Sequence, residues 1–218
     1  MHLISSHNLS QNKPVITGIT GGIGSGKSTV AEFLARRFHL CRLSADAYVH
    51  DLLEPGEAGW EAIHNVYPHC VKSDQSIDKP LLRESLFNDE LLRQNINDAI
   101  HPLVQQKISA EIDRKSKEGV SHFLVEVPLL YEANWQHMFH NIIVVYASKE
   151  KCIERIMNRD NVTANEAEIS FATQLPMADK AELADHVIDN SGWWTDTLFQ
   201  LIHLGNILWP EESLLKYD

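Results

Sequence analysis

The stretch GGIGSGKST, Gly21 to Thr29, constrains the fold of this chain more than any other part of its sequence. The run before it, residues 15–20, is rich in β-branched residues, and the segment after it, STVAEFLARRF, carries apolar residues at helical spacing. The sequence therefore predicts a strand, a glycine-rich loop and a helix in succession. The residues that satisfy the pattern G-x-x-x-x-G-K-[ST] are Gly21, Gly26, Lys27 and Ser28.

The residue types in this loop suit it to hold the phosphate groups of a nucleotide. Glycines let the backbone turn so that successive N–H groups point inward, and the helix that begins near Lys27 adds the positive end of its dipole. In loops of this pattern the lysine reaches the β- and γ-phosphates, and the next hydroxyl, here Ser28, binds Mg²⁺. The alternative is an ordinary glycine-rich turn with a chance lysine, which the complete motif in its required context disfavours.

The composition is that of a globular chain. The 218 residues suffice for one sizeable core, or for one core with a small insertion, and 44% of them are hydrophobic and 22% charged. The formal net charge of -11 repels nucleic acid and acidic membrane surfaces, so we expect neither as a partner. An anionic small molecule must then be held by local basic groups and metal.

Nothing in the sequence indicates export or membrane insertion. The N-terminal segment lacks the basic start and apolar centre of a signal peptide, and no apolar run reaches membrane-spanning length. The three cysteines, Cys41, Cys70 and Cys152, are scattered and lack metal-ligand spacing. Reduced thiols in a cytoplasmic protein are the simplest account of them.

Five apolar runs predict strands that alternate with helices. They lie at residues 15–20, 40–44, 122–127, 141–147 and 186–189. Such alternation, with the first strand leading into the glycine-rich loop, predicts an α/β fold with a doubly wound parallel sheet of five strands. A terminal amphipathic helix is expected at about residues 194–208.

The stretch between residues 52 and 119 is mainly helical and too long for a simple crossover between two strands. We expect an inserted substrate-binding unit there, with a helix break at His101 because Pro102 follows it. The other parts are then a core domain of residues 15–51 and 120–208, an N-terminal extension of residues 1–14 and a C-terminal surface tail of residues 209–218.

Asp46 follows the predicted strand at residues 40–44. If this strand and the first one belong to one right-handed βαβ unit, both open at the same sheet edge, and Asp46 lies beside the glycine-rich loop. The alternative for Asp46 is the N-cap of the helix AYVHDLL, a common position for aspartate.

Two arginines, Arg155 and Arg159, lie four residues apart on one face of a predicted helix. The capping box Thr163-Ala164-Asn165-Glu166 then starts a further helix, expected to run through Gln174. The arrangement favours a lid that closes over phosphates. The alternative is a solvent-facing pair matched with Glu154 and Asp160.

Seven motifs, in chain order, closely resemble those of the dephospho-coenzyme A kinase family. They are GGIGSGKSTVA, ADAYVHDLLEPGE, LLRESLF, HPLV, VPLLYE, RIMNRDNVTANEAE and ADHVIDNSG, and they extend from about Ile16 to Gly192. The resemblance implies a P-loop kinase fold with a core domain, a helical domain for the CoA substrate and a lid at about residues 155–174. It also implies ATP-dependent phosphorylation of the ribose 3′-hydroxyl of dephospho-coenzyme A (dephospho-CoA), the last step of coenzyme A synthesis.

The resemblance further implies roles for individual residues. Asp46 matches the general base, which can also be tied to Mg²⁺ through water, and Arg155 and Arg159 match lid arginines that act with Lys27 on the transferring phosphoryl group. Residues that match the ATP-phosphate loop are Gly22, Ile23, Gly24, Ser25, Gly26, Lys27, Ser28 and Thr29. Residues that match substrate-side positions are Arg83, His101 and Pro102. Residues that match family positions without a role that we can assign are Gln174, Lys180 and Asp185.

Two of these substrate-side residues have plainer alternatives from spacing alone. His101 can be a hinge residue near a helix end, and Arg83 a solvated charge on a helix face. The chain also departs from the family pattern twice. Ser44 stands where the family has the first aspartate of Asp-Ala-Asp, and His50 where it has an arginine, so neither a carboxylate at 44 nor an arginine clamp at 50 is claimed.

Three other functions compete with this interpretation. Another small-molecule or nucleoside monophosphate kinase would share the loop and the lid. A GTPase switch is the second alternative, because Asp189 to Gly192 match the motif D-x-x-G. This match lies far from the loop in the sequence, and no Asn-Lys-x-Asp follows it. A structural protein with an inert loop is disfavoured by the intact Lys27, Ser28 and Asp46.

Overall fold

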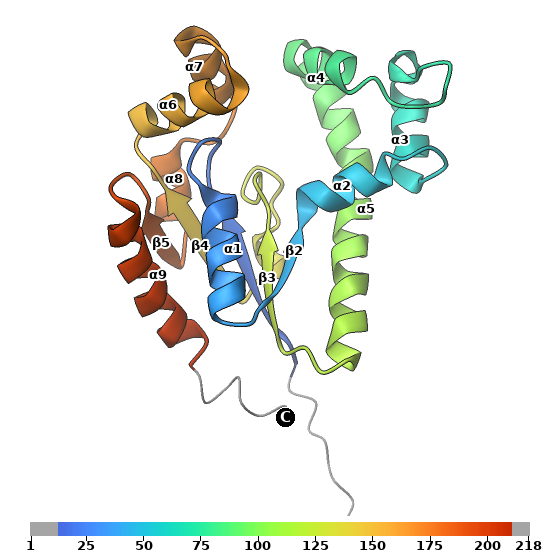
Figure 1. The fold of residues 1–218 in the computed structure, drawn as a ribbon. Helices are drawn as coiled ribbons and strands as arrows, with labels where there is room; N and C mark the ends of the chain where they lie inside the picture. The colour runs from blue at the N-terminus through green and yellow to red at the C-terminus, as the bar shows by residue number, and fades with distance from the viewer. Residues whose placement is uncertain (1–12, 211–218) are drawn as a thin grey trace, which may run out of the picture.

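The computed structural model describes residues 13–210, and its centre is an all-parallel five-stranded sheet in the order β2-β3-β1-β4-β5 (Figure 1). The fold class expected from the sequence is thereby confirmed. Three of the predicted strands end or begin one residue away from the observed ones. The strands are β1 (Val15–Thr20), β2 (Cys41–Ser44), β3 (His122–Glu126), β4 (Asn141–Tyr146) and β5 (His186–Asp189).

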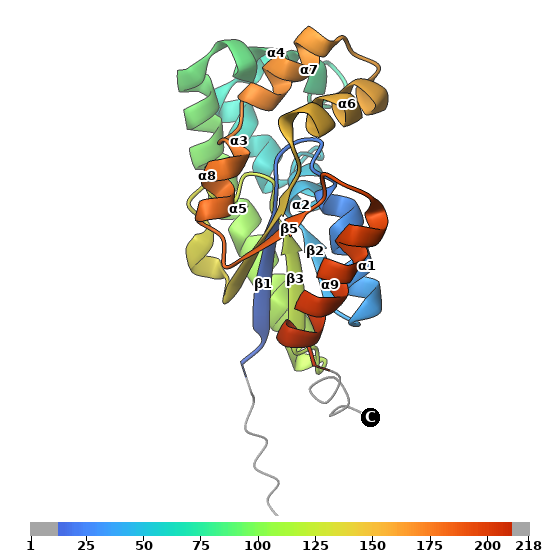
Figure 2. The ribbon, with the colours of Figure 1, turned by 90° about the vertical axis from the view of Figure 1, so that its left-hand side faces the viewer.

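Helices connect the strands and cover both faces of the sheet (Figure 2). Within residues 13–210, none of them combines the length and apolar character needed to cross a membrane. The α-helices are α1 (Lys27–Arg37), α2 (Ala45–Leu52), α3 (Ala58–Val66), α4 (Lys79–Asn88), α5 (Glu90–Lys117), α6 (Lys149–Asp160), α7 (Ala164–Ala172), α8 (Met177–Glu182) and α9 (Trp194–Leu208). Two 3-10 helices are η1 (Pro68–Cys70) and η2 (Gln136–Met138).

Each face of the sheet has its own hydrophobic core, because successive side chains of a strand point to opposite faces. On β3, Phe123 and Val125 pack into the core that α5 and α8 share, whereas Leu124 packs into the core that α1 and α9 share. Glu126 has the parity of Leu124, so it belongs to the α1 face. The strand pattern thus directs this carboxylate toward the helix that follows the glycine-rich loop.

Helix α5 is continuous from Glu90 to Lys117, so the break expected at His101 was wrong. A proline inside a helix removes one backbone hydrogen bond and costs about 3 kcal/mol. A stripe of buried apolar side chains at four-residue spacing on both sides of Pro102 offsets this cost by packing along one face. The residues of this stripe are Ile96, Ile100, Val104, Ile108 and Ile112.

The helical region between α2 and α5 extends beyond the β2 edge of the sheet (Figure 1). It nevertheless has no separate core. Ile63 of α3 and Leu82 of α4 belong to the same buried cluster as Phe123 and Val125 of the sheet, with the long helix α5 between them. The packing therefore joins the helical region to the core domain. That residues 52–119 form a separate substrate-binding unit remains a prediction about function.

The residue expected to begin a surface tail, Trp209, is fully buried. Its ring packs against Phe38 with 5.7 Å between ring centroids. Gly205, one turn earlier, leaves room for Phe38, since a Cβ at this glycine would collide with that ring. The core therefore includes Trp209. The rest of the expected tail from residue 211 and most of the expected N-terminal extension, residues 1–12, lie outside the described residues.

We expect Trp209→Ala to lower the free energy of unfolding by about 3 kcal/mol, because it leaves a cavity between α1 and α9. Urea unfolding followed by circular dichroism measures this change. The matched control is Trp193→Ala, whose side chain is 82% exposed and which should change stability by less than about 0.5 kcal/mol. Equal losses in the two variants would contradict the packing described for Trp209.

Candidate active site

The glycine-rich loop joins β1 to α1 and requires glycine at two positions. Gly24 and Gly26 have φ angles of 79° and 87°, in the left-handed region that side chains disfavour. A Cβ at Gly24 would lie 2.5 Å from the carbonyl oxygen of Cys152, and one at Gly26 would collide with the side-chain amide of Asn190. The loop is therefore packed tightly against segments that come much later in the chain.

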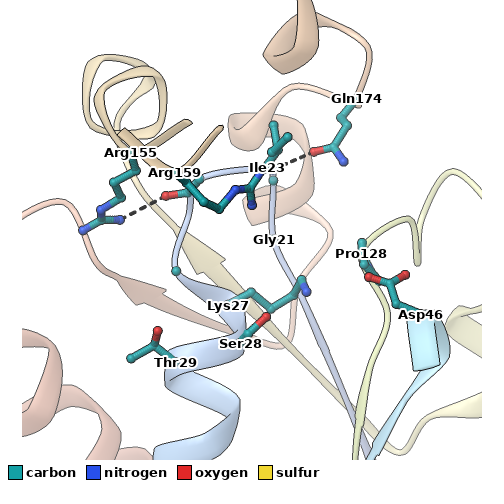
Figure 3. A pocket seen from close by; sticks show the side chains of 13 residues that line it. Gly21, Ile23, Lys27, Ser28, Thr29, Asp46, Pro128, Arg155, Arg159 and Gln174 are labelled. Carbon is teal, nitrogen blue, oxygen red and sulfur yellow. Dashed lines mark hydrogen bonds between the residues drawn. The ribbon is translucent and has the colours of Figure 1, made fainter. Parts of the chain in front are cut away.

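The loop surrounds a cavity of about 550 Å³ at the carboxyl end of the sheet (Figure 3). Asp46 lies across this cavity from Lys27, as the shared edge of parallel strands predicts (Figure 3). Ser25 is the one predicted loop residue that does not line the cavity; it is fully buried. The lining residues are Gly21, Gly22, Ile23, Gly24, Gly26, Lys27, Ser28, Thr29, Asp46, Pro128, Arg155, Arg159 and Gln174.

Glu126, at the end of β3, binds the two chemically active side chains of the loop. Its Oε1 accepts a hydrogen bond from Lys27 Nζ at 2.6 Å and another from Ser28 Oγ. Its Oε2 accepts a hydrogen bond from Arg42 Nη2 at 2.6 Å. Burial alone would raise the pKa of Glu126, but the charge of Lys27 and the three hydrogen bonds lower it to about 2. The carboxylate is therefore ionised while only 5% exposed.

Sequence reasoning missed Glu126, because we took the run HFLVEV only as a buried strand. A signal was available. P-loop NTPases hold Mg²⁺ with the Ser/Thr of the loop and one further acidic residue, and an acidic residue at the carboxyl end of a strand next to β1 is placed to be that residue. Ile19 of β1 pairs in register with Glu126, which places the carboxylate beside the start of the loop.

Asp46 is the second residue of α2, and Ser44 caps this helix by accepting a hydrogen bond from the backbone N–H of Ala47. The capping alternative for Asp46 was therefore wrong, and its carboxylate is left to face the cavity. Burial raises the pKa of Asp46; the nearby charge of Lys27 lowers it and that of Glu126 raises it. A carboxylate with a raised pKa is a better proton acceptor than an ordinary aspartate.

Arg155 reaches the loop but is not a free cation there. Its guanidinium donates hydrogen bonds to the carbonyl oxygens of Gly24, Ser25 and Asn190, at 3.2, 3.1 and 2.9 Å (the first is drawn in Figure 3). The pairing with Glu154 that the alternative required is not made, since Glu154 pairs with Lys151. Arg155 therefore supports the loop from behind while also lining the cavity.

Arg159 lines the cavity and forms a two-pronged ion pair with Asp160, through Nε and Nη2 at 2.7 Å each. The alternative considered from the sequence, a pairing with Asp160, is therefore correct for Arg159. The Arg159 side chain nevertheless lies at the loop (Figure 3). The hydrogen bonds from Arg159, and more weakly the charge of Arg83 on α4, lower the pKa of Asp160. The positive charge of Arg83 on α4 therefore acts on Asp160 at the end of α6.

Two side chains, one from the segment between α7 and α8 and one from the first residue of α8, accept hydrogen bonds from loop amides. Gln174 Oε1 binds the N–H of Ile23 at 2.8 Å, and Met177 Sδ binds the N–H of Gly22 at 3.0 Å. The helix expected to run through Gln174 ends earlier, at Ala172, while its capping box at Thr163 is confirmed. Because the helix stops, Gln174 is free to turn to the loop.

The other family positions without an assigned role are structural in this fold. Lys180 is fully buried and pairs with Glu132 at 2.8 Å, and its Nζ also donates to the carbonyl oxygen of Pro128 at 3.3 Å. Asp185 Oδ2 accepts from the N–H of Ile142 at 2.8 Å, at the start of β4. Lys180 thus ties α8 to the loop after β3, and Asp185 ties the start of β5 to β4.

The three residues predicted on the substrate side do not line the cavity. Arg83 lies on the exposed face of α4, and Pro102 is exposed in α5. His101 packs edge-on against Trp135 at 5.6 Å, and burial lowers its pKa. Of the two departures from the family pattern, Ser44 caps α2 and His50 lies at the surface near Glu54.

Comparisons with known proteins agree on one family. The model of the family "Dephospho-CoA kinase" matches residues 15–196. A dephospho-CoA kinase from Shouchella clausii is 34% identical over 185 residues, which is 84% of this chain and 93% of that protein. A crystal structure from Thermus thermophilus has a TM-score of 0.78 at 29% identity and covers 90% of this chain and 99% of the other. The dephospho-CoA kinase from Campylobacter jejuni has a TM-score of 0.65 at 26% identity, with 90% and 98% covered.

The low pKa of Glu126 predicts a pH-dependent share of stability. A carboxylate whose pKa falls from 4.5 to about 2 on folding stabilises the fold above about pH 5 and loses this contribution as the pH falls toward 2. Urea unfolding of the wild type and Glu126→Gln measures it. The difference between their unfolding free energies should shrink by roughly 1 kcal/mol between about pH 6 and pH 3.5. A difference that stays constant over this range would contradict the ion-pair arrangement.

Proposed function

The chain belongs to the dephospho-CoA kinase family, and we propose that its reaction takes place in the cavity between the glycine-rich loop and Asp46. The reaction of this family, and of this chain, is transfer of a phosphoryl group from ATP to the ribose 3′-hydroxyl of dephospho-CoA, the last step of coenzyme A synthesis. The observation that carries the site assignment is the position of Asp46, which faces Lys27 across the cavity (Figure 3).

On the nucleotide side, we assign the phosphates of ATP to the loop from Gly22 to Thr29. The backbone N–H groups at the start of α1 and the ammonium of Lys27 supply positive charge where the phosphate chain would lie. Arg159 would add its charge from the lid. Arg155, whose guanidinium is held by three carbonyl oxygens, would act by fixing the shape of the loop.

On the acceptor side, we assign Asp46 as the general base that takes the proton of the ribose hydroxyl. Its raised pKa and its place in the cavity support this role. We further propose that residues 52–119 hold dephospho-CoA, with Arg83 directed at the mouth of the site. His101 and Pro102 then act through the shape of α5, since neither lines the cavity.

The residues at the end of the loop fit Mg²⁺. Oxygen ligands are what Mg²⁺ prefers, and the Ser28 hydroxyl, Glu126 and Asp46 supply them around one end of the cavity. The described residues contain no group of three or more histidine, cysteine or acidic side chains placed to bind a metal by themselves, which suits an ion that takes several ligands from phosphate and water. When bound, Mg²⁺ neutralises charge on the phosphate chain.

Phosphoryl transfer asks the protein mainly for positioning and charge stabilisation. Lys27 and Arg159 would stabilise the charge on the transferring group, while Asp46 accepts the proton as the new bond forms. The segment of residues 155–174 would close over the phosphates and exclude water, which would otherwise hydrolyse ATP. Its contact with the loop through Gln174 supports this assignment.

We propose a cytoplasmic location, which the free state of Cys41, Cys70 and Cys152 supports. The negative formal charge supports a small-molecule substrate held by local cations over a nucleic-acid partner.

Release of ADP, coupled to an indicator enzyme, tests the activity directly with dephospho-CoA as acceptor. Mass spectrometry should find a product heavier by one phosphoryl group, placed on the 3′-hydroxyl. Phosphorylation of a nucleoside monophosphate, with none of dephospho-CoA in the same panel, would refute the assignment.

Asp46→Asn should retain ATP binding and lose about two to four orders of magnitude in turnover, because the amide cannot accept the proton. Steady-state kinetics and ATP calorimetry on the same sample separate the two effects. Turnover at the wild-type rate would remove Asp46 from the mechanism.

Lys27→Ala should weaken both ATP binding and turnover, because the ammonium contacts the phosphates before and during transfer. The measurement is KM for ATP together with kcat. The exposed Arg36→Ala on α1, whose side chain pairs with Glu32, is the control and should leave both constants unchanged. Unchanged constants for Lys27→Ala would contradict the phosphate-binding role.

A further inference from the structure

We propose that Arg42 is a positioning residue of this site: it holds Glu126 in place while Lys27 turns from that carboxylate to the bound nucleotide. The proposal rests on the proposed function only in taking the loop as the ATP site. Arg42 is outside every motif that resembles the family and does not line the cavity.

The two oxygens of Glu126 have different partners. Oε1 binds Lys27 and Ser28, both of which line the cavity, whereas Oε2 binds Arg42 from the opposite side. Arg42 comes from β2, where Cys41 and Leu43 pack into the α5 core and Arg42, by alternation, faces the α1 side. Its side chain is one-third exposed, against 6% for that of Glu126.

Lys27 cannot serve Glu126 and ATP equally. The Lys27 ammonium sits 2.6 Å from Oε1, so a phosphate chain in the loop competes with Glu126 for its charge. If Lys27 moved to the phosphates with nothing on Oε2, the buried carboxylate would have no cation beside it until Mg²⁺ is bound, which is costly. A guanidinium on Oε2 removes that penalty, because it stays charged and keeps its hydrogen bond throughout.

Two consequences follow. With Arg42 present, Lys27 is one of two cations on Glu126, so it can turn to phosphate at low cost. Without Arg42, Lys27 is the one cation left among the described ion pairs of Glu126. The Lys27–Glu126 ion pair is then stronger than in the wild type, and ATP must break it to bind Lys27. Loss of Arg42 should therefore weaken ATP binding more than it slows the chemical step.

The test measures ATP binding by calorimetry, with and without Mg²⁺, and KM for ATP and kcat with dephospho-CoA. Arg42→Met should raise the Kd and the KM for ATP about tenfold, the effect of one hydrogen bond to a charged group, with kcat changed less than about threefold. Arg42→Lys should recover most of the lost affinity. Arg36→Met, which removes an exposed arginine paired with Glu32 on α1, is the matched control and should behave like the wild type.

A double-mutant cycle decides whether Arg42 acts through Glu126. In a Glu126→Gln background, adding Arg42→Met should change ATP affinity less than about twofold, because the charge that Arg42 holds is gone. The same tenfold loss in that background would overturn the proposal and mean that Arg42 acts on ATP itself. Wild-type affinity in folded Arg42→Met would overturn it as well.

Thermal unfolding checks that each variant is folded, and Arg42→Gln replaces Arg42→Met if the latter is not. The ATP calorimetry tests the role of Arg42 independently of the proposed reaction. If the wild type binds ATP but does not phosphorylate dephospho-CoA, the assigned substrate fails while the Arg42 measurements still stand.

Discussion

The carboxylate of Glu126 is the interaction on which the arrangement of the site depends. It is buried at the end of β3, it is ionised, and it draws together three donors from two elements: Lys27 and Ser28 from α1, and Arg42 from β2. Because a buried charge must be compensated, these donors are held close to one another before any ligand arrives. The strand register, which pairs Ile19 of β1 and Ser44 of β2 with Glu126, makes this meeting possible.

The loop itself is held by residues distant in the sequence. Arg155 and Asn190 bind carbonyl oxygens on its outer side, and Gln174 and Met177 accept from its first amides. Two of these four, Arg155 and Gln174, lie within residues 155–174, the region that we assign to the lid. Any movement of that region is therefore felt by the loop, which gives a physical route between lid position and phosphate binding.

Much of the fold followed from local pattern. The sequence predicts the positions of the strands, the loop, the capping box at Thr163 and the terminal helix to within one or two residues. Each of these features depends on the types of residues that are adjacent in the sequence. The errors arose where packing outweighed local preference. Pro102 lies inside a helix since buried isoleucines hold both sides of it, and Trp209 leaves the expected tail because Phe38 and Gly205 form a place for its ring.

For the site, the sequence by itself determined the phosphate-binding loop, the nearness of Asp46 and the family, since these depend on motif spacing and on the rule that parallel strands open at one edge. The tertiary structure alone decided which charges meet. Glu126 stands out only once its strand is known to lie beside β1, and nothing local distinguishes Arg42 from a surface charge or Arg155 from a lid cation without partners. Ion pairs and hydrogen bonds between residues about a hundred positions apart depend on strand order and register, which no short stretch of sequence contains.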